Sequence, residues 1–204
     1  MTDSPGSRKV SRTRKSQAVE MSSLSNHFLI AMPNMRDPSF VRSVAFMCQH
    51  NAEGAMGVVV NRLSEYRLGD VLAQMGLKSD LAEVEDAPVL IGGPVQPERG
   101  FVLHVPHGNW ESSYKVSESL CVTTSRDVLV AIAEGRGPQR ALVALGYAGW
   151  GAGQIETELK ENGWLTAHAS DEILFDTPLE QRWDAAAALV GASISNLAGY
   201  AGNA

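Results

Sequence analysis

The sequence has few cysteines, few aromatic residues and no long apolar run. Two cysteines, Cys48 and Cys121, are too few for a disulfide framework or a zinc site built from cysteines, which largely excludes those two classes of protein. No stretch approaches the ~18 consecutive apolar residues of a membrane-spanning helix, so we expect no membrane insertion. The motifs G-x-S-x-G, H-E-x-x-H and C-x-x-C are also missing, which removes common signatures of hydrolases, metallopeptidases and thiol oxidoreductases. We therefore predict no catalytic residue set, no metal and no cofactor.

The composition that remains is typical of one folded domain. The chain has 204 residues, of which 44% are apolar and 20% charged, with a formal net charge of −6. A domain of this size buries about 70% of the surface that its unfolded chain exposes. Apolar content this high argues against a disordered protein. Composition indicates a soluble, cytoplasmic domain of mixed α/β type, and it does not indicate an activity.

The first twenty residues differ in charge from the rest. Residues 1–20 carry five basic and two acidic side chains, whereas residues 21–204 carry 12 basic and 21 acidic ones. Because the segment has almost nothing apolar to bury, we expect a disordered basic extension. It is open to interpretation as a nucleic-acid arm, a transit peptide or an extension upstream of Met21. A transit peptide is disfavoured, since Pro5, Gly6 and scattered serines leave no apolar face for an amphipathic helix. An extension without a function of its own is favoured, because short basic runs are common and unspecific.

Apolar runs and turn residues predict eight strands and four helices. The expected strands cover 27–32, 41–48, 56–60, 88–91, 100–105, 119–124, 141–147 and 172–175. The expected helices cover 68–75, 125–134, 152–161 and 178–190. Thr124 and Thr177 have the spacing of helix caps, and Pro178 suits a first helical position. The predicted fold class is α+β (α/β): a single domain, residues 21–204, in which helices pack against a mixed β-sheet.

A glycine-rich segment, Gly146–Gln154, lies between an expected strand and an expected helix. Backbone N–H groups in such a turn can face a phosphate. The spacing matches neither G-x-G-x-x-G nor G-x-x-x-x-G-K-[ST], and the carboxylates of Glu156 and Glu158 would repel an anion at the start of the helix. A tight turn that packs Tyr147 and Trp150 against the core is therefore favoured.

Four other local patterns have both a chemical and a structural interpretation. Gly92-Gly93-Pro94 makes a rigid turn that suits ligand binding or a simple chain reversal. Cys48 lies two residues before His50, which permits a thiol and base pair, but a free cysteine is more often a small buried hydrophobe. His104 and His107 point to opposite faces of an extended chain and lack a third metal ligand. Ser112–Lys115 matches S-x-x-K by chance, since it lies in a loop without the partner motifs.

Read in chain order, several blocks of the sequence resemble those of the AlgH/YqgE family of bacterial proteins. The blocks are Leu24–Pro33, Gly54–Arg62, Gly92–Val95, Gly146–Gln154 and Leu174–Pro178. The resemblance runs from about Leu24 to the C-terminus, where Gly202-Asn203-Ala204 replaces the family's frequent Gly-His-Ala. It implies a compact α/β cytosolic protein of a family labelled as candidate transcriptional regulators, without an established enzymatic activity.

The resemblance also implies a surface cleft near the glycine turns. Carried onto this chain, the candidate cleft residues are Asn61, Arg62, Gly92, Gly93, Pro94, Tyr147, Trp150 and Gln154. Arg62 would then pair with a small anionic ligand, because a guanidinium group suits phosphate or carboxylate.

Three functional hypotheses follow from the sequence. The first is a non-enzymatic regulatory or interaction protein that acts indirectly on gene expression through a protein partner. Direct DNA binding is disfavoured, because residues 21–204 are acidic. The second is a small-molecule or nucleotide-binding enzyme or sensor that uses the cleft. The third is redox sensing through Cys48, which requires an accessible thiol of low pKa.

Overall fold

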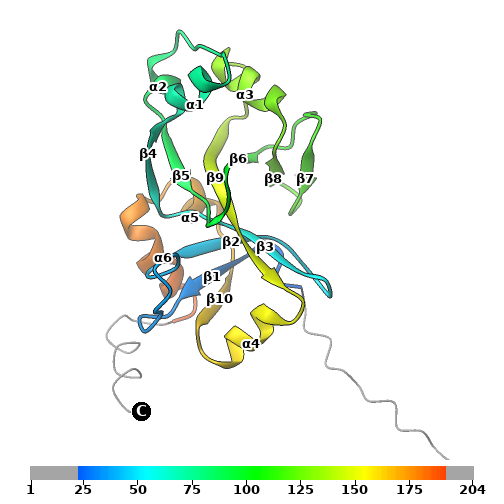
Figure 1. The fold of residues 1–204 in the computed structure, drawn as a ribbon, viewed down its shortest axis with the longest axis vertical. Coiled ribbons are helices and arrows are strands. Elements are labelled where there is room, and N and C mark those ends of the chain that lie inside the picture. Colours follow the sequence, from blue (N-terminus) through cyan, green and yellow to red (C-terminus); the bar gives the residue numbers. More distant parts are fainter. Residues whose placement is uncertain (1–22, 192–204) are drawn as a thin grey trace, which may run out of the picture.

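The computed structural model describes residues 23–191, and this part of the chain is built around the long strand β9 (Figure 1). The strands are β1 (His27–Ala31), β2 (Val44–Asn51), β3 (Gly54–Val59), β4 (Leu63–Arg67), β5 (Pro88–Ile91), β6 (Val95–Val105), β7 (Ser113–Lys115), β8 (Cys121–Thr123), β9 (Arg140–Gly151) and β10 (Trp164–His168). The helices are α1 (Leu68–Gln74), α2 (Ala82–Glu85), α3 (Arg126–Ala133), α4 (Gln154–Lys160), α5 (Asp171–Phe175) and α6 (Arg182–Ala188), with a 3₁₀ helix at Leu179–Gln181.

The strands form one ten-stranded sheet in the order β10-β1-β2-β3-β9-β6-β8-β7, with β5 between β4 and β9. β5 runs parallel to β9, and the other pairs are antiparallel. The prediction of a single domain with a mixed sheet and packed helices is confirmed. The chain is richer in sheet than a simple α/β fold, and the sheet is strongly curled (Figure 1).

β9 is shared by two halves of the molecule. Its residues 140–147 pair with β6, and 143–145 also pair with β5, whereas 148–151 pair with β3. We call β4–β8 with α1, α2 and α3 the upper half, and β1, β2, β3 and β10 with α4 and α6 the lower half. Figure 1 shows β9 running from one half into the other. The two halves are thus held together by a continuous backbone.

Glycine permits the change of partners along β9. Gly146 has a φ of 73°, and a Cβ there would meet the carbonyl oxygen of Gly93. Gly93 has a φ of 154°, and its own Cβ would meet the backbone of β9. Both positions need glycine, because the two backbones approach too closely for a side chain. The predicted tight turn between strand and helix is wrong over 146–151, since β9 continues to Gly151 and only Gly153 turns the chain into α4.

Three apolar clusters fill the interior. The central cluster joins both halves and includes Phe28, Phe46, Phe101, Leu103 and Trp183. The lower cluster lies under α4 and includes Leu29, Met47, Trp150, Ile155 and Trp164. The upper cluster lies under α1 and α3 and includes Leu72, Val102, Leu129 and Val143. β9 contributes a residue to every cluster, which makes it the axis of the core.

The C-terminal elements differ most from the prediction. The strand predicted at 172–175 is wrong, because these residues lie in α5, whose N-cap Ser170 accepts a hydrogen bond from the Ile173 N–H at 3.5 Å. The helix predicted at 178–190 is divided into the 3₁₀ helix and α6, and Pro178 precedes the first of them. The N-cap of α3 is Ser125 and not Thr124.

The described residues contain no helix that is both long and apolar enough to cross a membrane. The predicted basic extension, residues 1–20, lies outside the described range, as does Gly202-Asn203-Ala204.

Candidate functional site

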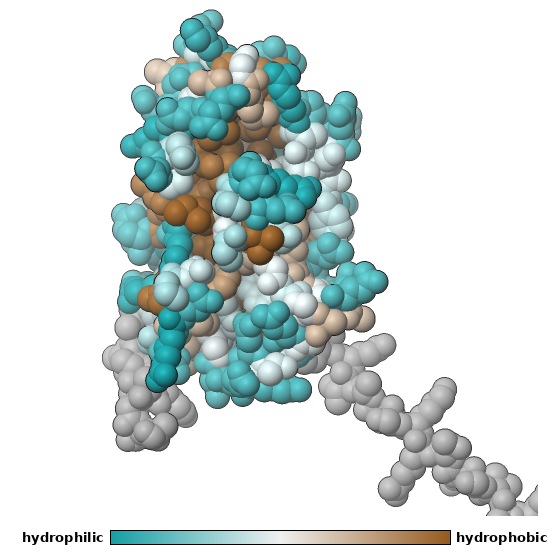
Figure 2. All heavy atoms as spheres, in the orientation of Figure 1, coloured by the Kyte–Doolittle hydropathy of each residue, from teal (hydrophilic) through white to brown (hydrophobic). Residues whose placement is uncertain are grey.

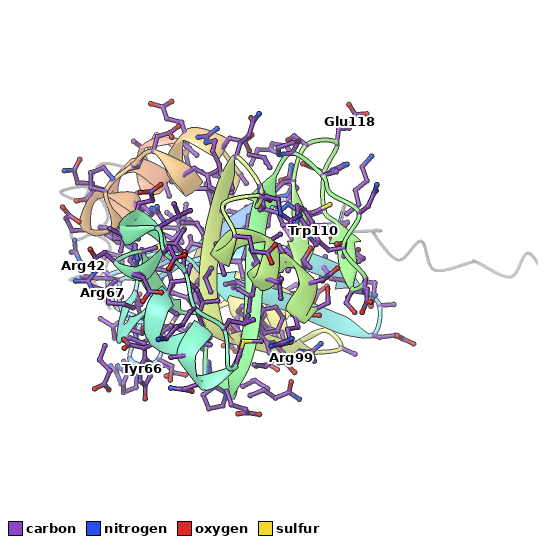
Figure 3. The ribbon with its side chains drawn as sticks, turned by 90° about the horizontal axis from the view of Figure 1, so that it is seen from above. Arg42, Tyr66, Arg67, Arg99, Trp110 and Glu118 are labelled. Atoms are coloured by element: carbon purple, nitrogen blue, oxygen red, sulfur yellow. The ribbon has the colours of Figure 1, made fainter. Side chains whose placement is uncertain are left out.

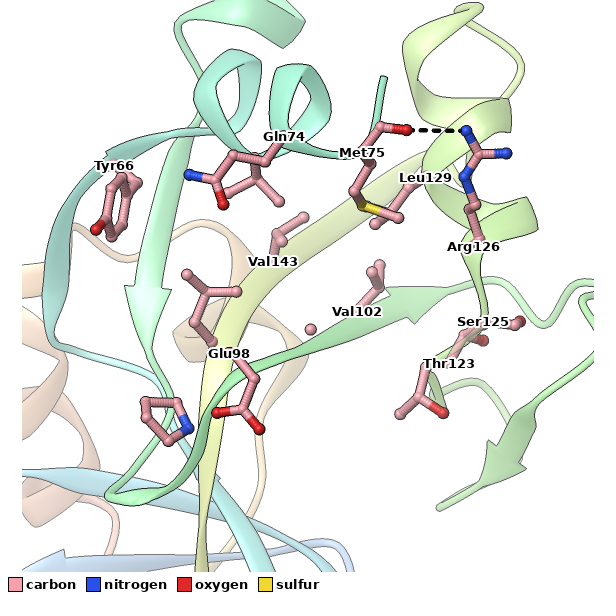
Figure 4. Close-up of a pocket in the computed structure, with 15 residues that line it drawn as sticks. Tyr66, Gln74, Met75, Glu98, Val102, Thr123, Ser125, Arg126, Leu129 and Val143 are labelled. Atoms are coloured by element: carbon pink, nitrogen blue, oxygen red, sulfur yellow. Dashed lines mark hydrogen bonds between the residues drawn. The ribbon is translucent and has the colours of Figure 1, made fainter. Parts of the chain in front are cut away.

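A cavity of about 560 Å³ opens in the upper half between α1, α3 and the sheet (Figure 4). Its walls come from β4, α1, β6, β8, α3 and β9. Figure 2 shows apolar side chains in a recess of this half, surrounded by polar ones. We refer to it as the upper cavity.

The floor of the upper cavity is apolar. Val102, Leu129 and Val143 line it and expose only 3%, 6% and 5% of their surfaces. Leu129 faces the sheet because it shares one side of α3 with Ala133, one helical turn further on. Met75, at the end of α1, adds a flexible thioether to the wall. The floor is therefore part of the upper cluster, held rigid by the sheet below.

The rim of the upper cavity is polar. Glu98 on β6 and Arg126 on α3 are exposed, and Thr124 and Ser125, which precede Arg126 in the chain, also line the cavity. The Nη2 of Arg126 donates to the carbonyl oxygen of Met75 at 3.0 Å, which ties α3 to the end of α1 (Figure 4). An apolar floor with a few polar groups at the rim suits an amphipathic ligand.

A buried hydrogen-bond chain adjoins this cavity at Thr123. The Nδ1 of His104 lies 3.0 Å from the carbonyl oxygen of Pro106, and its Nε2 lies 2.8 Å from Oγ1 of Thr123. Since a carbonyl only accepts, Nδ1 carries the proton and Nε2 accepts from the Thr123 hydroxyl. Thr123 in turn accepts from the Ser113 hydroxyl at 2.7 Å. Burial lowers the pKa of His104, which keeps the imidazole neutral and the chain of donors intact.

The two glycine segments predicted to line a cleft lie directly against each other. The N–H of Gly92 donates to the carbonyl oxygen of Leu145 at 2.7 Å, and Gly93 packs on the backbone of Tyr147. Pro94 follows as an exposed residue. Backbone atoms thus occupy the space between the two segments, and their closeness is explained by packing.

Asn61 and Arg62 hold the loop that joins β1 to β2. The side chain of Asn61 bonds the backbone of β2 and of the preceding loop at 2.8 and 2.9 Å. Both Nη atoms of Arg62 donate to carbonyl oxygens, those of Pro38 at 2.9 Å and Val41 at 2.8 Å. The Arg62 carbonyl also accepts from the Ile91 N–H, beside the Gly92 turn. The backbone of Arg62 therefore lies beside the Gly92 turn, but its guanidinium is engaged by the loop between β1 and β2, which does not favour a role as anion partner.

Trp150 lies near the C-terminal end of β9, and Gln154 is the first residue of α4. They line a cavity of about 330 Å³ beside α4, which we call the lower cavity. The indole N–H groups of Trp150 and Trp164 donate to Oε2 of Glu158 at 3.1 and 2.8 Å, and the Gln154 amide donates to Oε1 at 2.9 Å. Tyr147 and Trp150 also border a shallow groove of about 380 Å³ near the β2–β3 turn. The eight predicted residues are thus divided among several places, and their functional role stays a prediction.

Cys48 and His50 do not form a thiol and base pair. Cys48 is fully buried, and burial raises the pKa of its thiol to about 12. The Nδ1 of His50 accepts from the Leu24 N–H at 3.0 Å, and its Nε2 lies 2.9 Å from a carboxylate oxygen of Glu156. Both ring nitrogens are engaged, and the thiol is shielded from solvent. This geometry opposes the redox hypothesis.

The histidines give no sign of a metal centre. His107 bonds the carbonyl oxygen of Ser117 at 3.1 Å, and His104 is engaged in the buried chain. Within residues 23–191, no group of three or more His, Cys, Asp or Glu side chains is placed to hold a metal ion. Ser113–Lys115 form the edge strand β7 and not the start of a helix, so S-x-x-K lacks its usual setting.

Sequence reasoning named Trp150 and Gln154, which line the lower cavity, but it missed the other residues that build the two cavities. The floor of the upper cavity looks like ordinary core in the sequence, because Val102 and Val143 lie in apolar runs. Glu158 of the lower cavity carries a weak signal, since it lies four residues after Gln154 on one face of a helix. Only the fold brings Trp164 of β10 next to Trp150 of β9.

Similarity to known proteins extends over nearly all of the described chain. The model of the family described as AlgH-like, DUF179, matches residues 28–195. A UPF0301 protein of Methylococcus capsulatus is 53% identical over 180 residues, which cover 88% of this chain and 96% of that protein. A UPF0301 protein of Xanthomonas campestris is 55% identical over 181 residues, 89% of this chain and 96% of that protein.

Two solved structures are similar in fold. The solution structure of the AlgH protein from Pseudomonas aeruginosa has a TM-score of 0.75 and 46% sequence identity, covering 94% of this chain and 100% of that one. The crystal structure of protein DIP2367 from Corynebacterium diphtheriae has a TM-score of 0.61 and 19% identity, covering 78% of this chain and 82% of that one. The second likeness shows the fold alone.

Proposed function

Because the chain belongs to the AlgH-like family and contains an open cavity with an apolar floor, we propose that it is a non-enzymatic regulatory protein that responds to a small amphipathic molecule. It acts in the cytoplasm through a protein partner, and its effect on gene expression is indirect.

The upper cavity is the observation that carries this proposal. Its volume of about 560 Å³ lies within the range of roughly 300–1,000 Å³ that is usual for small-molecule pockets. An apolar ligand body fits on Val102, Leu129 and Val143, and a polar end reaches the rim near Glu98 and Arg126. The walls are supplied by strands as well as by helices, so the site is largely formed before binding.

The surface beside the cavity supports a role in partner contact. β4 pairs only with β5 and is an edge strand of the described sheet. Leu63 and Tyr66 on this strand are 52% and 43% exposed, and Tyr66 also lines the upper cavity. Unpaired edge groups and exposed apolar side chains favour contact with another chain. A ligand that touches Tyr66 would therefore alter the surface that a partner meets.

Direct DNA binding remains disfavoured in this proposal. The described residues carry an excess of acidic side chains. Figure 3 places Arg42 and Arg67 on one side of the molecule and Arg99 on another, so these cations do not gather on one face. A phosphate backbone is bound by cations that share a surface.

The proposal is tested by a thermal-shift screen of the full chain against metabolites, nucleotides and short nucleic acids. A ligand at a hundred times its Kd adds about 2.7 kcal/mol of stability, which is readily seen. Gly100→Leu is the blocking variant, because Gly100 lines the cavity and a Cβ there meets no atom within 4 Å. Gly151→Leu is the matched control, since its Cβ meets only Gln154 Oε1 at 3.8 Å.

We expect at least one amphipathic compound to stabilise the protein against heat. This stabilisation should be lost in Gly100→Leu and kept in Gly151→Leu. A blank screen, or a hit that Gly100→Leu retains, would contradict ligand binding in the upper cavity. A nucleotide hit lost in Arg62→Ala would instead support the second hypothesis, in which an anion binds near the glycine turns.

A further inference from the structure

The lower cavity has aromatic walls. It lies between the loop after β1, α4 and the start of β10, and Phe40, Trp150 and Trp164 line it. The ring centroid of Phe40 lies 6.1 Å from that of Trp150 and 5.4 Å from that of Trp164, and the two indole centroids are 6.0 Å apart. The tryptophans are 5% and 3% exposed, whereas Phe40 is half-buried. The indoles therefore form a rigid floor, and Phe40 is the more open wall.

A carboxylate is fixed at this floor. Glu158 accepts from both indole N–H groups and from the Gln154 amide, as described above. The Gln154 carbonyl oxygen in turn accepts from the Gly151 N–H at 2.9 Å, which holds the amide in place. All three donors to Glu158 are neutral, so they orient the carboxylate without cancelling its charge. None of the ion pairs of residues 23–191 includes Glu158.

The other charged residues of the lower cavity give it a negative sign. Asp37 and Glu161 line it together with Glu158, and Arg36 is the one basic residue among its lining side chains. Arg36 is exposed and belongs to none of the ion pairs of the described chain. Attraction between opposite charges is stronger in a partly dry cavity than in water. The lower cavity therefore favours a cation and opposes the anionic ligand that the sequence suggested near Trp150.

We propose that the lower cavity binds a small organic cation, an alkylammonium group whose charge lies near Glu158 and whose alkyl groups contact Phe40 and Met35. Aromatic rings attract ammonium groups, and the thioether of Met35 adds an apolar contact. A bare metal ion is not the expected occupant, because it needs several closely grouped oxygen ligands and the described residues offer no such group. This inference concerns a different cavity from the proposed function and does not depend on it.

A purely structural role for Glu158, tying the two tryptophans to α4, uses the same hydrogen bonds. The two interpretations differ in ligand binding. Choline is a suitable probe, and its neutral isostere, with a quaternary carbon in place of the nitrogen, has the same shape without the charge. The full chain is titrated with each at constant ionic strength, and the indole N–H signals are followed by NMR. Trp110 and Trp183 do not line the lower cavity and serve as internal references.

We expect choline to give saturable shifts of the Trp150 and Trp164 indole signals, with the reference indoles unmoved and the isostere without a saturable effect. Glu158→Gln is expected to weaken choline binding about tenfold, and Glu161→Gln or Phe40→Leu several-fold. Glu83→Gln makes the same charge change on α2, away from the cavity, and leaves binding unchanged.

Equal binding of choline and its isostere would overturn the proposal, and so would the absence of shifts at Trp150 and Trp164. If Glu158→Gln does not fold, the choline affinities of Glu161→Gln and Phe40→Leu are compared with that of Glu83→Gln. Equal choline affinity in all three variants contradicts the proposal. If Gly100→Leu still binds choline but no longer binds the amphipathic compound found in the thermal-shift screen, the two cavities bind their ligands separately.

Discussion

The two ends of β9 carry cavities of different chemistry. Near its start, Val143 and Leu145 form part of the apolar floor of the upper cavity. Near its end, Gly149 and Trp150 face the lower cavity, whose lining is aromatic and acidic. The strand changes partners between Tyr147 and Ala148, directly after Gly146. A single strand can therefore supply two sites, because each half of it is covered by different elements.

The buried polar groups of the two halves also differ. In the upper half, His104 and Thr123 form a neutral hydrogen-bond chain behind the cavity. In the lower half, carboxylates are used: Glu158 holds two indoles, and Glu156 holds His50. Neutral and charged networks respond differently to substitution and to pH, which makes the comparison testable.

The largest expected effect comes from the junction that joins the halves. Gly93→Ala places a Cβ against the backbone of Tyr147 and is expected to cost about 3 kcal/mol or more of unfolding free energy, measured by urea denaturation. Gly76→Ala is the control, because Gly76 has a φ of 70° but open space around its Cβ, and we expect a loss of about 1 kcal/mol. Equal losses would contradict a tightly packed junction.

The next largest loss of stability is expected from a substitution that affects the lower half and not the upper half. Glu158→Gln cannot accept all three hydrogen bonds in the same way, and we expect a loss of about 1–3 kcal/mol. Glu161→Gln, an exposed neighbour, is expected to stay within about 0.5 kcal/mol of the wild type. Hydrogen exchange should show the added opening in β10 and α4 and not in α3. Faster exchange in α3 would show that the halves are not independent.

A smaller loss of stability is expected as the pH is lowered, and the upper half should lose stability at a higher pH than the lower half. Burial keeps the pKa of His104 below its ordinary value of 6.5. As the pH falls below about 6.5, the unfolded chain takes up the proton before the folded one, so stability falls by up to about 1.4 kcal/mol per pH unit. Replacing the imidazole, in His104→Gln, should flatten this dependence between pH 6.5 and 5.

Acid should act on the lower half only at lower pH. The backbone hydrogen bond at Glu156 holds the pKa of that carboxyl below its ordinary 4.5, and the bond from His50 adds to this. Its contribution to stability is present above about pH 4.5 and is lost as the pH falls through the lowered pKa. Hydrogen exchange at pH 6.5 and 5 should therefore show a change around His104 and none around Glu156. Simultaneous opening of both regions would contradict the comparison.

The smallest expected effect is the alkylation of the two cysteine thiols in the folded protein. Cys48 is fully buried with a pKa raised to about 12, and burial also raises the pKa of Cys121, which is 4% exposed. We expect neither thiol to react with iodoacetamide in the folded protein, and both to react after unfolding, as counted by mass spectrometry. Rapid alkylation of native Cys48 would restore the redox hypothesis.

Much of the fold was predictable from local patterns, and the sites were not. Apolar runs predict β1, β5 and β8 because these strands are buried, whereas β4 reads LSEYR, is mostly exposed and leaves no such pattern. The glycine segments correctly suggest a close approach of two backbones. The sequence does not show that Gly93 and Gly146 contact each other and not a ligand. Packing between distant segments brings Trp150 of β9 to Trp164 of β10 and Val143 of β9 to Leu129 of α3, and such long-range contacts are invisible to local reasoning.

The claim that β9 serves two chemically distinct cavities is tested most directly by one pair of NMR titrations. Hexanol, an uncharged amphipathic probe, and choline are added separately to the full chain, and methyl and indole signals are followed together. We predict that hexanol shifts the methyl groups of Val102, Leu129 and Val143 and leaves the indoles of Trp150 and Trp164 unmoved, while choline does the reverse. Both probes moving the same set of signals, or neither moving either set, would contradict the account.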